Sequence, residues 1–227
     1  MSDISVVMPV FNGEQYLAEA IESVHSQTLQ PAELIVVDDG STDQSANVAT
    51  SLGAKVLRCT HAGNGQALNK GVEAATGSIL AFLDSDDLWP PARCEVLSAL
   101  LAADSTLDAV AGLVDEFVSP ELTAGERAGL RRPHVGAPSV QANVMLIRHS
   151  AFDVVGPFQE ELQLGTGLDW GGRVSLSAIR LCRTDQVVLL RRLHLHNSGI
   201  KNKGERGSYA IILKRRLDRI RREEQGR

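Results

Sequence analysis

Three carboxylates, Asp84, Asp86 and Asp87, lie within four residues and directly follow the apolar run 79–83. Like charges this close repel one another, so they destabilise a fold unless water separates them or a cation binds between them. Two carboxylates spaced as Asp-x-Asp just beyond a strand can reach one hard divalent cation, which can in turn neutralise a diphosphate. The stretch therefore indicates either a solvated acidic turn or a cation site.

Two other polar stretches follow predicted strands earlier in the chain. Pro9-Val-Phe-Asn12 contains an aromatic ring, and Asp38-Asp39-Gly-Ser-Thr-Asp43 contains three carboxylates. Ligands of an open parallel sheet collect beyond the carboxyl ends of its strands. An aromatic ring there can stack on a nucleobase, and a carboxylate can accept hydrogen bonds from the base or from ribose hydroxyls. These stretches therefore favour a nucleotide as the ligand.

The elements that must position these residues alternate along the first hundred residues. Apolar, β-branched runs predict strands at 4–10, 34–37, 55–59 and 79–83. Apolar residues at helical spacing predict helices at 14–24 and 66–75, and Asn12 is the expected N-cap of the first. A capping box of Ser41 and Gln44 is expected to begin another helix, which Gly53 ends. This alternation predicts an α/β fold with a mostly parallel, Rossmann-like sheet flanked by helices.

The pattern after Trp89 is less regular. We expect a helix at 91–103, a strand at 107–114, a long loop at 119–138, a strand at 140–147, a helix whose latter part is 174–181, and a strand at 187–190. Residues 197–207 are polar and are expected to be mobile. The predicted organisation is one domain at 1–199, followed by a C-terminal helical extension within 200–227.

The formal net charge of −5 over 227 residues is unevenly distributed. From Arg191 onward there are twelve Lys and Arg residues and four acids, which makes this part +8 and leaves −13 for the rest. A nucleic-acid-binding protein would be expected to spread basic residues over a folded face, so we expect no nucleic-acid partner. Three dispersed cysteines, no signal peptide and no apolar run of about 18 residues lead us to expect a cytoplasmic protein with reduced thiols.

The basic residues near the C-terminus fall on a predicted amphipathic helix at 209–222. Tyr209, Leu213, Leu217 and Ile220 lie on one side of it, and basic residues fill much of the remainder. Such a helix can lie on an anionic membrane, which would place the protein at the inner membrane face. Because the apolar stripe is thin and lacks Trp and Phe, we favour docking on the acidic domain, or on a second copy of it in a homo-oligomer.

The three chemistry-bearing stretches, taken together, carry a resemblance. Val6-Val-Met-Pro-Val-Phe-Asn12, Leu34-Ile-Val-Val-Asp-Asp-Gly-Ser-Thr-Asp43 and Leu83-Asp-Ser-Asp-Asp-Leu-Trp89 resemble, in order and interval, family 2 of the inverting glycosyltransferases, which have the GT-A fold. The resemblance covers residues 4–115 and continues more loosely to 199. It implies a metal-dependent enzyme, using Mn²⁺ or Mg²⁺, that moves a sugar from a nucleotide diphosphate donor, with a UDP-sugar expected. The acceptor, whether a glycan, a lipid-linked molecule or a peptide, is not identified.

The resemblance also implies donor-binding residues. Phe11 would lie against the donor base, Asp39 would read the edge of that base, and Asp84 would lie near the ribose. Further donor contacts are implied for Pro9, Asn12, Glu14, Asn69, Ser85, Arg192 and Asn197. The other histidines are expected in surface or structural positions: His25, His61, His134, His149 and His196.

The metal ligands and the base are assigned in the same way. Asp86 is the implied metal ligand, and His194, in a late Arg-x-His segment, is the second. The family often has a Glu-Asp pair where this chain has Thr166-Gly167, and Asp169 is the carboxylate left in that segment, so it is the expected catalytic base. A second departure is Leu68, which stands where an arginine is common. These departures keep open a catalytically weak sugar-nucleotide-binding module. A nucleotidyltransferase shares the α/β plan and metal use, but it would be expected to have a glycine-rich loop with Arg or Lys after the first strand.

Overall fold

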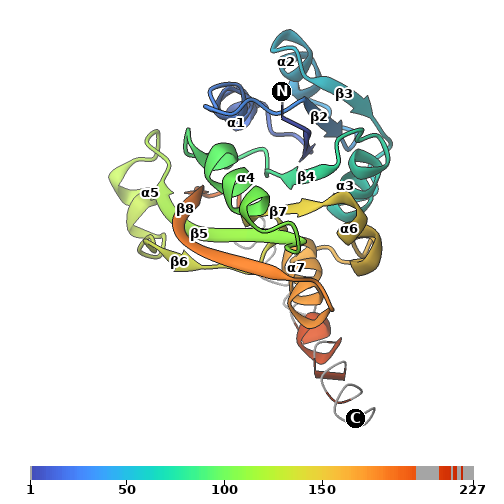
Figure 1. Cartoon of the computed structure of the whole chain (residues 1–227). Helices are drawn as coiled ribbons and strands as arrows, with labels where there is room; N and C mark the ends of the chain where they lie inside the picture. The colour runs from blue at the N-terminus through green and yellow to red at the C-terminus, as the bar shows by residue number, and fades with distance from the viewer. Residues whose placement is uncertain (1, 198–209, 216, 219–220, 222–227) are drawn as a thin grey trace.

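The computed structural model describes residues 2–197, 210–215, 217–218 and 221. In this part of the chain an eight-stranded sheet runs in the order β3-β2-β1-β4-β7-β5-β6, with β8 beside β5 (Figure 1). One half of the sheet is parallel and consists of β1 (Ile4–Val10), β2 (Glu33–Asp38), β3 (Lys55–Arg58) and β4 (Ile79–Phe82). The other half is mixed and consists of β5 (Ala109–Val118), β6 (Ala137–Pro138), β7 (Met145–Arg148) and β8 (Leu181–Leu193). The expected α/β sheet is therefore confirmed, with antiparallel strands added to it.

The parallel half is held by close packing of helices on a fully buried central strand. The helices that follow the four strands of this half along the chain are α1 (Glu14–His25), α2 (Ser45–Ser51), α3 (Asn64–Glu73) and α4 (Arg93–Ala103), and α4 packs on β5 and β8. All seven residues of β1 are buried, as is typical of a parallel strand in the middle of a sheet. A Cβ on Gly71 of α3 would lie 2.2 Å from Val7 Cγ1 and 3.1 Å from Val37 Cγ2, so glycine allows this helix to approach β1 and β2.

The second half of the chain contributes shorter elements. They are α5 (Ala124–Ala128), the 3₁₀ helix η1 (Ala142–Val144), α6 (His149–Val155) and α7 (Thr166–Leu176). Four aromatic rings, from Phe82, Phe152, Phe158 and Trp170, pack at centroid separations of 5.1 to 6.5 Å and join β4 to α6 and α7. This cluster ties the irregular half of the chain to the parallel half.

Two predicted helix caps are wrong. The N-cap of α1 is Gly13, and α2 begins at Ser45 with Gln44 as its N-cap. Asn12 has a positive φ of 50°, and its backbone N donates to Ser41 Oγ at 2.9 Å. Both side chains bond to the neighbouring loop instead of the helix end, because the loops after β1 and β2 lie side by side.

The second half also departs from the predicted pattern. The expected loop at 119–138 contains α5 and β6, the first part of the expected strand at 140–147 is η1, and α6 was not predicted. The helix expected to reach residue 181 ends at Leu176, and β8 then runs from Leu181 to Leu193. Its residues 183–186 are polar, so they carry no apolar signal, and the register of β8 against β5 shifts between Arg183 and Val187.

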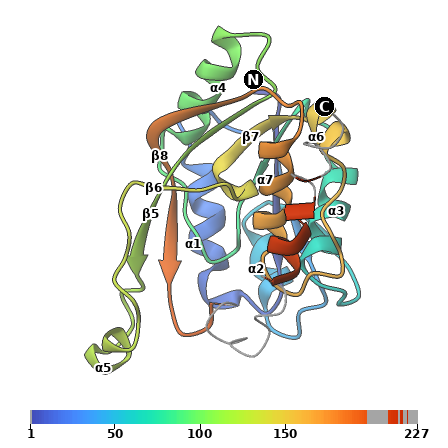
Figure 2. The same cartoon turned by 90° about the horizontal axis from the view of Figure 1, so that it is seen from below.

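The C-terminal helix is described in part. The described residues do not include 198–209, which hold Tyr209 and most of the segment that was expected to be mobile, and they do not include Ile220. Residues 210–215 are helical, and Figure 2 shows them in red next to α7. Ile212 is buried and Arg215 Nη2 lies 2.6 Å from Glu161 Oε1, whereas Leu213 is 58% exposed. The described residues therefore contact the domain through a face other than the predicted stripe. No helix in the described residues is long and apolar enough to cross a membrane.

Candidate functional site

The carboxyl ends of the parallel strands meet at one edge of the sheet. Val10 is paired with Asp38, the backbone N of Asp39 donates to Val10 O at 2.8 Å, and Leu83 N donates to Val7 O at 3.2 Å. Backbone bonds between Leu88 and Leu190, at 2.9 and 3.0 Å, bring β8 to the same edge. The three stretches singled out from the sequence therefore lie together, and the segment after β8 joins them.

Two of the three aspartates after β4 are withdrawn from water beside like charges, Asp87 being buried and Asp84 half-buried. Desolvation and the neighbouring charge of Asp86 raise the pKa of Asp84 to about 6, although Asn143 Nδ2 donates to its Oδ2 at 2.9 Å. Burial and the charges of Asp86 and Asp84 raise the pKa of Asp87 well above its usual value. The positive charge of Arg191 opposes both shifts without cancelling them. The cluster therefore has more negative charge than its surroundings compensate.

Asp86 and His194 form a pair of side chains with metal-ligand chemistry in this cluster. His194 is buried, and its Nε2 lies 2.9 Å from Asp86 Oδ2, while Asn197 Nδ2 lies 3.3 Å from the same oxygen. The described residues contain no group of three or more His, Cys, Asp or Glu that could hold a metal. A carboxylate and an imidazole would fit a divalent cation that completes its coordination with phosphate oxygens and water. The donor set thus fits a cation shared with a diphosphate.

Arg192 is a buried positioning residue of this site. Its backbone N donates to Asp87 Oδ1 at 2.9 Å, and its Nε donates to the backbone O of Asp86 at 3.0 Å. Its two terminal nitrogens bond to Ser119 Oγ at 3.2 Å and Glu19 Oε2 at 2.6 Å. Because these groups occupy the guanidinium inside the protein, the geometry favours a role in holding the acidic turn over the implied direct donor contact.

Phe11 and Asp39 form the second part of the edge. Phe11 is 47% exposed, and its ring stacks on His61 with centroids 4.0 Å apart and planes inclined by 19°. Asp39 is buried, and its two oxygens accept from the backbone N of Ala62 at 2.9 Å and of Gly63 at 2.8 Å. His61 Nδ1 lies 2.9 Å from Asp39 Oδ2 and 3.1 Å from the backbone O of Asp39. A flat, exposed ring thus lies next to a buried carboxylate, and this arrangement is suited to binding a nucleobase.

The other implied donor residues have mostly structural contacts. Asn12 Oδ1 accepts from Thr42 N at 2.8 Å and Glu14 Oε2 accepts from Gln44 N at 2.8 Å, so both link the loops after β1 and β2. Pro9 is buried within β1, and Ser85 lies against Gly13, where an added Cβ would be 3.2 Å from Ser85 Oγ.

Asn69 is occupied in the same way. Its Nδ2 donates to Phe158 O and Glu160 Oε1, both at 3.0 Å, and its Oδ1 accepts from Phe158 N at 2.8 Å. Asn69 therefore anchors the 158–160 segment to α3, and these contacts argue against a direct bond to a donor.

Asp169 lies in a buried ion pair on α7. Its Oδ2 is 3.1 Å from Arg173 Nε, and both side chains are buried. Arg173 also donates to the backbone O of Val155 at 2.8 Å and of Pro157 at 2.6 Å. A general base needs an oxygen that the acceptor can approach, so this geometry argues against the predicted catalytic role of Asp169.

The start of α7 lies near the acidic cluster, although neither Thr166 nor Gly167 is an acid. A Cβ added to Gly167 would lie 3.7 Å from Ala142 N in η1, an ordinary contact distance. The neighbouring residue of η1, Asn143, is the one that bonds to Asp84. Position 167 therefore has room for a side chain close to the site.

Sequence reasoning missed Asn143 and assigned His61 to a surface or structural position. Asn143 is 59 residues from Asp84 in the chain, and nothing around it marks it as a ligand of that carboxylate. His61 follows β3 at the same sheet edge as Phe11 and Asp39, which is the one signal that could have found it.

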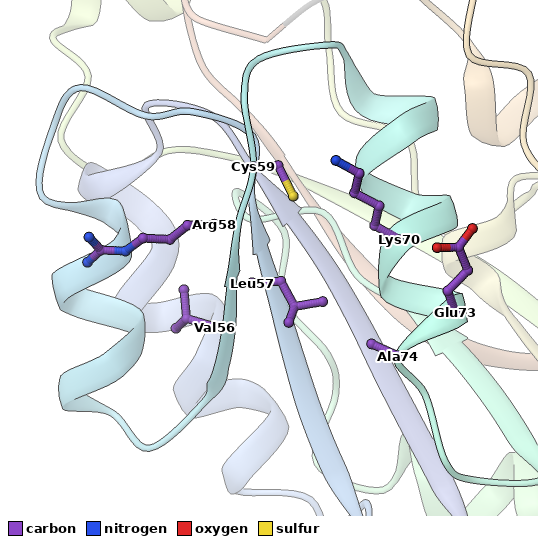
Figure 3. Close-up of a pocket in the computed structure, with 7 residues that line it drawn as sticks. All are labelled: Val56, Leu57, Arg58, Cys59, Lys70, Glu73 and Ala74. Carbon is purple, nitrogen blue, oxygen red and sulfur yellow. The ribbon is translucent and has the colours of Figure 1, made fainter.

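A shallow cavity of about 530 Å³ lies elsewhere, between β3 and α3 (Figure 3). It is lined by Val56, Leu57, Arg58, Cys59, Lys70, Glu73 and Ala74. None of the acidic-cluster residues lines it, so we place the functional site at the carboxyl edge on chemical grounds.

Comparison with known proteins agrees with this geometry. A family model described as "Glycosyl transferase family 2" matches residues 5–152. An uncharacterized glycosyltransferase of Rickettsia typhi is 29% identical over 205 residues, which is 84% of this chain and 64% of that protein. One from Nostoc sp. is 43% identical over 98 residues, which is 40% of this chain and 30% of that protein. The chain thus spans less than two thirds of the length of these relatives.

The fold also matches solved structures. Residues 1–349 of TarS from S. aureus superpose with a TM-score of 0.70 at 21% identity, covering 97% of this chain and 65% of that one. Structures of the same protein in complex with UDP and with UDP-GlcNAc match with TM-scores of 0.67 and 0.69. These matches confirm the expected GT-A fold. The family match covers more than half of the chain and all three stretches, and the chain therefore belongs to glycosyl transferase family 2.

Proposed function

We propose that this chain transfers a sugar from a nucleotide diphosphate donor to an acceptor, with inversion at the anomeric carbon. The observation that carries the proposal is the aspartate cluster after β4, whose uncompensated charge lies beside His194 and close to an exposed ring with a carboxylate. TarS, which shares the fold, has been solved with UDP and UDP-GlcNAc, so we propose a UDP-sugar as the donor. The nucleotidyltransferase alternative has no support from the family match.

Each part of the site would contact one part of the donor. Phe11 would stack on the base, Asp39 would accept a hydrogen bond from its edge, and Asp84 would accept one from the ribose. Asp86 and His194 would hold Mn²⁺ or Mg²⁺. Such a cation supplies positive charge that offsets the charge developing on the departing diphosphate, so no protein acid is needed to protonate the leaving group.

The acceptor must lose a proton as it attacks, and this step is where the chain departs from its family. Asp169 is occupied by Arg173, and Gly167 provides no side chain. This observation also favours a second candidate function, a module that binds the sugar nucleotide with little or no transfer. The two candidates agree on donor binding and differ in turnover.

Calorimetry with UDP and UDP-GlcNAc, with and without Mn²⁺, tests donor binding. We expect metal-dependent binding of both nucleotides, and a sugar transfer assay with glycan, lipid-linked and peptide acceptors then separates the two candidates. Absence of nucleotide binding under all these conditions would contradict both.

Gly167→Asp tests whether the base is the missing part. The space beside Ala142 accommodates the side chain, and a positioned base contributes about 10² to 10⁴ in rate, so we expect turnover to rise at least about tenfold. Gly172→Asp is the matched control, because it adds the same charge to α7 where no atom lies within 4 Å of the added Cβ. If the parent is active and Gly167→Asp adds nothing, the base is another group or belongs to the acceptor.

The cytoplasmic location, the homo-oligomer and the membrane-surface alternative stay predictions, and so does the division of the chain at residue 199.

A further inference from the structure

His61 makes the two contacts that the proposed function assigns to the nucleobase of the donor. Its imidazole stacks on Phe11, with centroids 4.0 Å apart and planes inclined by 19°. Its Nδ1 lies 2.9 Å from Asp39 Oδ2. We propose that His61 occupies the base position in the free chain and that the donor must displace it, an inference that rests on the proposed function.

The similarity is chemical as well as geometric. Imidazole is a flat ring with an N–H at its edge, and a uracil base is a flat ring with an imide N–H at its edge. Both can stack on a phenyl ring while donating to a carboxylate. One slot beside Phe11 and Asp39 therefore accepts either ring, and the two compete for it.

The contact of His61 with Asp39 is the exchangeable one. The two oxygens of Asp39 also accept from the backbone N of Ala62 and of Gly63, and these main-chain bonds can persist when a ligand binds. His61 Nδ1 lies 2.9 Å from Asp39 Oδ2 and 3.1 Å from the backbone O of Asp39, and its side chain is 56% exposed, so its ring can rotate into solvent. Rotation of the ring away from Asp39 frees acceptor positions on this residue for the base.

The backbone of His61 packs against the loop after β2, and rotation of the side chain is sufficient for the exchange. Gly40 has a φ of +77°, and a Cβ there would lie 2.8 Å from His61 N. The loops after β2 and β3 are thus in direct contact at this point. His61 stays beside the base slot whichever way its ring points, which makes it a self-ligand of high local concentration.

A competing side chain lowers apparent affinity by the fraction of chains in which the slot is free. Aromatic stacking and a hydrogen bond are each modest interactions in water, so we expect His61→Ala to tighten UDP binding about three- to tenfold. His25→Ala is the matched control. His25 is also exposed, it lies at the end of α1 away from the slot, and its ring bonds to the backbone carbonyl of Leu52.

The test is calorimetric titration of parent, His61→Ala and His25→Ala with UDP, with melting temperatures to verify that each folds. In the parent, we expect the ring current of Phe11 to shift the NMR signals of the His61 ring protons, and we expect this shift to be lost when UDP is added. Tighter UDP binding by His61→Ala alone, with loss of that shift in the parent, supports the proposal.

Two results would overturn it. Weaker UDP binding by His61→Ala would show that His61 holds the base from its other side, and unchanged binding would show that the ring does not compete. If neither the parent nor the variants bind UDP, the proposed function fails and this inference fails with it. If the parent binds UDP and the affinity does not depend on His61, this inference alone fails.

Discussion

Two acidic regions next to Arg191 differ in how their charge is compensated. Glu116 of β5 accepts bonds from Arg131 to both carboxylate oxygens, and it also accepts from Arg191 Nη1 at 3.3 Å and His134 N at 3.0 Å. Burial alone would raise the pKa of Glu116, but the Arg131 and His134 bonds and the two arginine charges lower it to about 2.

The aspartates after β4 have the opposite balance. Desolvation and mutual repulsion raise the pKa of Asp84 to about 6 and that of Asp87 well above its usual value. A carboxylate whose charge is balanced by neighbouring arginines stabilises the fold. A desolvated cluster of carboxylates with too few neighbouring cations lowers the stability of the fold unless a bound ligand supplies a cation. Glu116 therefore holds the 131–134 segment, whereas we propose that the aspartate cluster binds a cation.

The largest expected effect is that of Asp86→Asn. The substitution keeps the shape and the acceptor for His194 but removes the charge that would hold the cation. We expect metal-dependent UDP binding to be lost and any turnover to fall about 10²-fold or more. The metal-free melting temperature should not fall, because repulsion on Asp84 and Asp87 is relieved.

Calorimetry with and without Mn²⁺ measures the binding, and Asp185→Asn removes one exposed charge elsewhere as the control. If Asp86→Asn bound UDP as tightly as the parent and still required the metal, the proposed cation site at the aspartates after β4 would be contradicted.

Asp169→Asn should act on stability, since Asp169 belongs with the compensated acids. The substitution takes the carboxylate charge away from a buried arginine, Arg173, which should cost about 2 to 3 kcal/mol in the free energy of unfolding. Turnover by the folded protein should fall by less than about tenfold, because no proton transfer is lost. Urea unfolding and an assay at saturating donor measure the two effects. A loss of about 10²-fold in turnover at unchanged stability would instead restore Asp169 as the base.

Glu116→Gln should have the smallest effect and a defined pH dependence. The pKa of Glu116 is lowered from 4.5 to about 2 in the folded chain, so the unfolded chain takes up the proton first as pH falls. Its stabilisation is therefore full above about pH 4.5 and is lost as pH falls toward 2. Because the arginine partners are partly exposed and screened, we expect a difference of about 1 kcal/mol near pH 6.

Unfolding of the parent and of Glu116→Gln by urea at about pH 6 and about pH 3 checks this prediction. The difference between them should shrink at the lower pH, and a difference that grows on acidification would contradict the assigned direction.

The parallel half of the fold and the sheet edge that carries the candidate site could be predicted from the amino-acid sequence. Apolar runs and helical spacing are local signals, and they predicted β1 to β4 and the helices between them within a few residues. Because parallel strands end at one edge, the order of the elements along the chain was enough to place Phe11, Asp39 and the aspartates after β4 together. Polar strands carry no such signal, which is why the first half of β8 was not predicted.

The partner that each polar side chain takes could not be predicted, because it depends on how the folded chain packs. Asp39, Asp86 and Asp169 are the same residue type, yet one bonds to the backbone of the next loop, one to His194 and one to Arg173. Their partners come from segments whose approach depends on how the whole sheet and its helices pack. The same carboxylate group can cap a helix, form an ion pair or bind a metal cation. The group that the fold brings within hydrogen-bonding distance determines which of these it does.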